Sequence, residues 1–69
     1  MNPLFIQKLR VTRSTSLKLH DLACGAMRFY KAADPQLAYN RFIEAQTMIG
    51  VLSTLIENNI RDLEKEGLK

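Results

Sequence analysis

Apolar residues recur every three or four positions along the second half of the chain, which is the pattern of a long helix with one apolar side. Asp34 and Pro35 stand where this pattern begins, and Asp followed by Pro suits the cap and first position of a helix. Gly67 follows its end and suits a helix C-terminus. The pattern therefore predicts a helix over residues 35–66. Its apolar stripe consists of Leu37, Ala38, Phe42, Ala45, Met48, Ile49, Leu52, Leu55, Ile56, Ile60 and Leu63.

Two shorter helices are predicted ahead of this long one. Asn2-Pro3 repeats the cap-and-proline signal, so a short helix is expected over residues 3–12. The polar run at residues 13–16 interrupts the apolar pattern and supplies a second cap. A helix is then expected over residues 16–33. The predicted fold class is all-α, an antiparallel helical hairpin with a short additional N-terminal helix, in a single domain over residues 1–69.

The size of the chain predicts that the hairpin needs support. A chain of 69 residues buries a small share of its surface, and folds of this size usually need a disulfide, a metal or another chain. Cys24 is the only cysteine and His20 the only histidine, so the chain offers neither an internal disulfide nor a Cys/His zinc site. We therefore expect no metal and no cofactor, and completion by oligomerisation or by a partner chain.

Part of the long stripe predicts where that partner binds. Alternating three- and four-residue steps, typical of a coiled-coil seam, connect Phe42, Ala45, Ile49, Leu52, Ile56, Asn59 and Leu63. Tyr39, Ile43 and Val51 lie outside the stripe. Tyr39 and Ile43, one turn apart, form with Gly50 and Val51 either a second contact face or a group of ordinary exposed residues. The predicted partner or oligomer interface consists of Phe42, Ile49, Leu52, Ile56, Leu63, Tyr39 and Ile43.

Asn59 interrupts this seam where Leu or Ile would fit, and it has two interpretations. A single Asn inside a coiled coil fixes register and oligomeric state. Alternatively, the end of the helix is exposed to solvent at this point.

Charge is divided unevenly between the halves of the chain, although the net charge is only +3. Residues 1–33 contain six cationic residues against Asp21 alone, whereas residues 34–69 contain four cationic residues against six acidic ones. This division indicates an acidic partner for the first half, or head-to-tail pairing between copies. The candidate contacts to an acidic partner or to nucleic-acid phosphates are Lys8, Arg10, Arg13 and Lys18, with an ordinary solvated face as the alternative.

The sequence contains no catalytic signature. Cys24 and His20 lie four residues apart and are neighbours on a helix, but no glycine-rich turn or strand supplies an oxyanion hole beside them. No phosphate-binding loop is present, and we expect no small-molecule substrate. No apolar run is long enough for a membrane span, and the N-terminus lacks the apolar core of a signal peptide. A cytoplasmic protein that is not an enzyme is therefore expected.

Two short segments resemble parts of known helical families. Residues 29–34, Phe-Tyr-Lys-Ala-Ala-Asp, followed by Leu37-Ala38, resemble part of the Hha/YmoA family of small nucleoid-associated modulators, although Pro35 stands where that family continues a helix. Asp34-Pro35 with Leu37-Ala38 and residues 53–55 is similar to the second half of type III secretion needle and inner-rod subunits, which are helical hairpins that polymerise. Because the two resemblances imply different functions, no functional residue is carried over from either.

The leading hypothesis is a small helical module for protein–protein interaction: an adaptor, chaperone-like subunit, inhibitor or assembly component. Its working surface is the apolar stripe of residues 35–66. The alternative is a small basic regulator that binds nucleic acid, or a DNA-binding protein, through its N-terminal half. A salt titration of binding to duplex DNA or RNA separates the two hypotheses.

Overall fold

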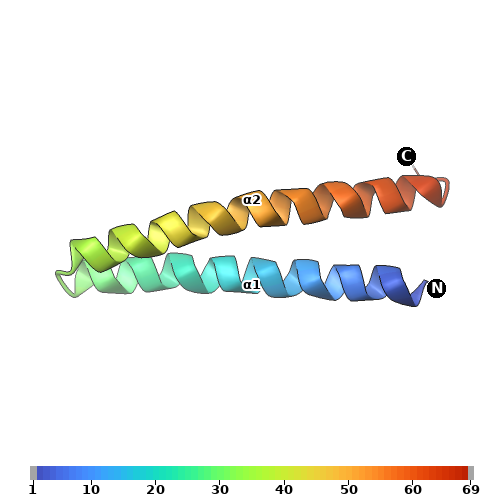
Figure 1. Ribbon diagram of the computed structural model, residues 1–69. Coiled ribbons are helices and arrows are strands. Elements are labelled where there is room, and N and C mark those ends of the chain that lie inside the picture. The colour runs from blue at the N-terminus through green and yellow to red at the C-terminus, as the bar shows by residue number, and fades with distance from the viewer. Residues whose placement is uncertain (1, 69) are drawn as a thin grey trace.

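The structure, a computed structural model, describes residues 2–68, which form two long helices joined by a short turn (Figure 1). Helix α1 is Pro3–Lys31 and helix α2 is Pro35–Lys65. The helices run antiparallel, so that both ends of the chain lie at the same end of a rod of 51 × 17 × 15 Å. The described residues contain no strand, so the predicted all-α helical hairpin is confirmed.

The prediction of a separate N-terminal helix over residues 3–12, followed by a helix over residues 16–33, is wrong because α1 passes through the polar run without a break. Hydroxyl groups in and beside this run donate to backbone carbonyls one turn back, which satisfies them inside a helix. These bonds run from Thr12 to Lys8 (2.8 Å), from Thr15 to Val11 (2.9 Å) and from Ser16 to Arg13 (2.8 Å). A polar composition at this point therefore does not end the helix.

Both helices begin at the predicted caps. The side-chain oxygen of Asn2 accepts a hydrogen bond from the N–H of Leu4 at 3.0 Å, and that of Asp34 accepts from the N–H of Leu37 at 3.1 Å. A proline follows each cap at the first helical position, where its missing N–H costs nothing.

The turn at residues 32–34 reverses the chain with one residue in the left-handed region. Ala33 has a φ of 62°, and the N–H of Asp34 donates to the carbonyl of Phe29 at 2.9 Å to close α1. The end of α2 repeats this Schellman pattern around Gly67, with a φ of 92°, which confirms the predicted stop. Alanine is strained in this conformation, by about 1–2 kcal/mol, whereas glycine is not.

Each helix turns one row of residues toward the other in alternating three- and four-residue steps, and we call these two rows the seam. All of its residues except Lys8 are buried or half-buried. The seam consists of Phe5, Lys8, Thr12, Thr15, Leu19, Leu22, Ala26 and Phe29 on α1, and of Ala38, Arg41, Ala45, Met48, Leu52, Leu55, Asn59 and Asp62 on α2.

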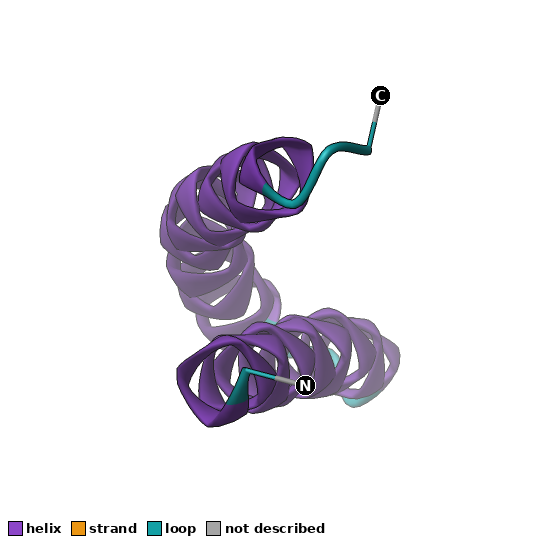
Figure 2. Ribbon diagram, turned by 90° about the vertical axis from the view of Figure 1, so that its right-hand side faces the viewer, coloured by secondary structure: helices purple, strands orange, loops and turns teal. Residues whose placement is uncertain are grey.

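The seam buries little apolar bulk. Its buried hydrophobic residues are Ala26, Ala38 and Ala45, and no large side chain among residues 2–68 is fully buried. These small residues let the helices approach near the turn, and the helices diverge toward the chain ends (Figure 2). The molecule exposes 5509 Å², whereas a compact monomer of its 7.9 kDa exposes about 4,400 Å². The hairpin thus leaves roughly 1,100 Å² of surface that a compact fold of this mass hides.

Candidate interaction surface

The apolar stripe of α2 is wider than the surface that α1 covers. Leu52, one of the predicted interface residues, lies in the seam against α1, and Leu63 is half-buried. The other predicted interface residues are exposed, namely Tyr39, Phe42, Ile43, Ile49 and Ile56. Most of the predicted interface is therefore available to another molecule.

The coiled-coil steps predicted for α2 meet α1 in one row only. Ala45, Leu52 and Asn59 face α1. The second row is Arg41, Met48, Leu55 and Asp62, one residue before the predicted Phe42, Ile49, Ile56 and Leu63.

The more polar row faces inward because α1 offers partners to its two ends. Lys8 forms an ion pair with Asp62 at 2.8 Å, and the guanidinium of Arg41 lies 5.7 Å from the centre of the Phe29 ring. The more apolar row is left outside the hairpin.

The two broad faces of the hairpin differ in chemistry. On one face, a groove of about 300 Å³ is lined by Leu19 of α1 and by Ile49, Leu52 and Ile56 of α2, with Ser53 and Glu57 at its edge. On the opposite face, a groove of about 250 Å³ lies between Lys18 of α1 and Glu44 of α2. Mainly apolar side chains therefore flank the groove on one side of the seam, and side chains of opposite charge flank the groove on the other.

Helical spacing extends these two faces along the rod, because residues seven apart lie on nearly the same side of a helix. We call the first surface the apolar face: Leu9, Ser16, Ala23 and Tyr30 of α1 with Phe42, Ile49, Ile56 and Leu63 of α2. It contains no charged residue, and every member except Leu63 is exposed. The matching rows on the opposite face, which we call the charged side, contain Lys18, Glu44 and Lys65 together with apolar residues such as Leu4, Val11 and Val51.

Exposed apolar residues are ordinary when scattered, but a continuous uncharged band on two helices is typical of a binding surface. Tyr30 is 71% exposed and Ile49 is 55% exposed within this band. Comparison with protein-family models, curated proteins and solved structures finds no match to this chain. The face is therefore interpreted from its own chemistry.

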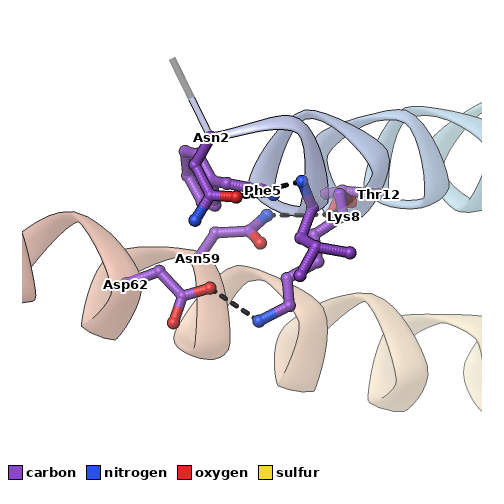
Figure 3. Close-up of polar contacts among 7 residues, drawn as sticks. Asn2, Phe5, Lys8, Thr12, Asn59 and Asp62 are labelled. Carbon is purple, nitrogen blue, oxygen red and sulfur yellow. Dashed lines mark hydrogen bonds and ion pairs between the residues drawn. The ribbon is translucent and has the colours of Figure 1, made fainter.

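A cluster of polar side chains joins the helices near the chain ends (Figure 3). Besides the ion pair of Lys8 with Asp62, the amide nitrogen of Asn59 donates to the hydroxyl of Thr12 at 2.8 Å. Asn59 is only 8% exposed, so its interpretation as a solvent-exposed helix end is wrong. The hydrogen bond and charge of Lys8, helped by the charge of Lys65, lower the pKa of Asp62 despite its partial burial. Both contacts fix which residues of the two helices lie level.

A hollow of about 580 Å³ opens between the diverging chain ends, with Leu4, Phe5, Val11 and Leu55 among its walls. The spacing of Leu4 and Val11 puts this hollow on the charged side of the seam. A partner that covers the apolar face leaves it open.

The cationic residues proposed for an acidic partner or nucleic acid do not share one face. Lys8 is held by Asp62 in the seam. At about 100° per residue, Arg10, Arg13 and Lys18 point roughly 200°, 140° and 280° around α1 from Lys8. Binding through this set stays a prediction, and a flat duplex surface would meet only part of it at a time.

The neighbouring Cys24 and His20 lie on an open helix surface. The sulfur of Cys24 is 3.7 Å from Nε2 of His20, whose Nδ1 is 3.7 Å from Asp21. Both His20 and Asp21 are exposed, and the grooves described above are lined by other residues. The pair therefore has no walls that would hold a substrate or exclude water.

Residues 2–68 contain neither a metal-binding cluster nor a membrane-spanning helix. No three side chains of the His, Cys, Asp or Glu type come together there in a way that would hold a metal ion. Neither helix combines the length and the apolar character needed to cross a bilayer.

Proposed function

We propose that this protein is a non-enzymatic interaction module that binds another protein chain through the apolar face. The observation that supports this proposal is the uncharged, exposed band along both helices, beside a seam whose buried hydrophobic residues are only alanines. A band of this length favours a helical partner, because amphipathic helices present apolar stripes of comparable length. A cytoplasmic location stays a prediction.

The size of the face is sufficient for binding. A half-exposed large apolar side chain offers on the order of 100 Å². The large exposed residues on and beside the face are Leu9, Met27, Tyr30, Tyr39, Phe42, Ile49, Ile56 and Ile60, which together give on the order of 800 Å². An area of about 800 Å² on one partner is the standard size for a specific protein–protein interface.

Site-specific photocrosslinking in the native host tests this proposal. A photoreactive phenylalanine analogue in place of Phe42 should cross-link to a protein, because that side chain lies in the apolar face. The same analogue in place of Val51, which lies on the charged side of α2, should give no such product. Equal cross-linking from both positions, or none from Phe42, contradicts the proposal.

A pair of aspartate substitutions provides the matched control. Ile49→Asp should abolish the cross-link from Phe42 and retain the helix content, because Ile49 is 55% exposed and lies outside the seam. Val51→Asp changes a side chain that is 44% exposed on the other side of the same helix, and the cross-link should persist. Circular dichroism of both variants separates loss of binding from loss of folding.

A further inference from the structure

We infer that the apolar face is covered by a second copy of this chain, in a two-fold dimer in which α1 of each copy lies on α2 of the other. Both turns then lie at one end of a four-helix bundle and all chain ends at the opposite end. This inference rests on the proposed function, since it names the partner of the apolar face.

The surplus surface fits a partner of the same dimensions. The hairpin exposes 5509 Å², roughly 1,100 Å² more than a compact monomer of its mass, and a stable interface hides about 800 Å² on each partner. The apolar face runs over both helices from Leu9 to Tyr30 and from Phe42 to Leu63. A single helix would cover only the middle of that width, whereas a second hairpin has two helices of the same length.

Symmetry then fixes the register. Lys8 contacts Asp62 and Thr12 contacts Asn59, so residues whose numbers add up to about 70 lie level in one hairpin. A half-turn about the long axis of the rod moves no residue along that axis. Each residue of α1 therefore faces the level residue of α2 from the second copy.

Opposite charges meet in this register along the outer edge of the interface. Arg13 comes level with Glu57 of the second copy. Arg10 falls midway between Glu57 and Glu64, about 5 Å along the axis from each, which is within the reach of an arginine side chain. The two-fold axis makes each of these contacts twice.

Apolar residues outside the apolar face also find partners in this register. Met27 comes level with Ile43 of the second copy, and both side chains are exposed in the single hairpin. Ile43 points away from the seam, so nothing within the hairpin explains an isoleucine there. Contact with Met27 of the second copy gives it a partner.

The other two-fold arrangement lacks this complementarity. A half-turn about an axis across the rod lays α1 on α1, and α1 has six cationic residues against Asp21 alone. If that axis crosses α2 at its midpoint, Glu57 comes level with Ile43 of the second copy instead of a cation. Charge therefore favours the arrangement in which α1 lies on α2.

The mass of the purified chain in solution is the first test, measured by light scattering during size-exclusion chromatography. The expected mass is twice 7.9 kDa. Ile49→Asp should reduce it to the monomer, whereas Val51→Asp should leave the dimer. A wild-type chain that is monomeric at all concentrations overturns this inference. The proposed function survives that result if the cross-link from Phe42 reaches a different protein, and fails if there is no cross-link.

A charge exchange tests the arrangement of the helices. Arg13→Glu and Glu57→Arg should each weaken the dimer roughly tenfold, because each places like charges opposite one another twice. An equimolar mixture of the two variants should restore dimers, since each mixed dimer regains both opposite-charge pairs. Each variant should keep the helix content of the wild type. If the double variant restores dimers but the mixture does not, the pair lies within one chain and the arrangement is wrong. The arrangement is also wrong if neither single variant weakens the dimer.

Discussion

Thr12 and Asn59 should respond very differently to substitution, although they share one hydrogen bond. In Thr12→Val the amide of Asn59, which is only 8% exposed, loses its acceptor at 2.8 Å. A buried donor without a partner costs about 1–3 kcal/mol, and Thr and Val have similar helix propensities. We therefore expect Thr12→Val to lower the free energy of unfolding by about 1–3 kcal/mol.

Asn59→Leu leaves no buried polar group without a partner, because the hydroxyl of Thr12 still donates to the carbonyl of Lys8 at 2.8 Å. Full burial of a leucine side chain contributes about 1.5–3 kcal/mol relative to exposure, so this variant should be at least as stable as the wild type. Thr12→Val should then lower the free energy of unfolding much less in the Asn59→Leu background than in the wild type. The difference is the coupling energy of the pair.

Urea unfolding followed by circular dichroism measures these values, at one fixed protein concentration because association shifts apparent stability. Thr15→Val is the matched control. The hydroxyl of Thr15 donates to the carbonyl of Val11, but within residues 2–68 it accepts no side-chain hydrogen bond. Its removal therefore leaves no buried donor without an acceptor. An equal cost of Thr12→Val with and without Asn59 would refute this reasoning.

Three further predictions concern stability. Ala33→Gly should stabilise the hairpin by about 1 kcal/mol in thermal unfolding, because it removes a left-handed alanine, whereas Ala32→Gly, at a φ of −83°, should destabilise it. Gly50→Ala should stabilise α2 by about 1 kcal/mol in urea unfolding, since an added Cβ meets no atom within 4 Å. The lowered pKa of Asp62 contributes stability that is fully present above the ordinary value of 3.8 and is lost as the pH falls through the lowered value. The stability difference between wild type and Asp62→Asn should therefore shrink on acidification through that window, and a constant difference would exclude this role for the Lys8 contact.

The helix ends were predictable from the sequence because their causes are local. Asn2 and Asp34 cap with their own side chains, and Gly67 supplies a backbone conformation that other residues adopt at a cost. The polar run at residues 13–16 led to the wrong prediction of a helix break, because that prediction too used only local preferences. Its residues favour caps, but inside a long helix their hydroxyls bond to the preceding turn.

The inward row of α2 was not predictable from hydrophobicity. Phe42 is more apolar than Arg41, so a stripe chosen by apolar character alone selects the row that lies outside the hairpin. The chemistry of α1 decides which row faces inward: the Phe29 ring contacts the guanidinium of Arg41, and Lys8 forms an ion pair with Asp62. These partners are 12 and 54 residues away along the chain, and their pairing exists only once the hairpin has its register.

The candidate site was partly predictable, because an apolar surplus is visible without knowledge of the seam. The exposure of Phe42, Ile49 and Ile56 agrees with their predicted role as a surface for a partner, although it does not test that role. The contribution of α1 through Leu9 and Tyr30 was missed. It depends on which flank of α1 lies beside which flank of α2, and only the antiparallel packing determines that.

The seam is unequal in strength along its length. Close-packed alanines hold the helices together near the turn, whereas an ion pair and one amide–hydroxyl bond hold the diverging ends. Backbone amides of the first and last turns should therefore exchange with solvent faster than those beside Ala26 and Ala38, as the rod opens from its loose end. A molecule bound along the apolar face would clamp that end most, so slowed exchange there, rather than at the turn, is the signature of occupancy.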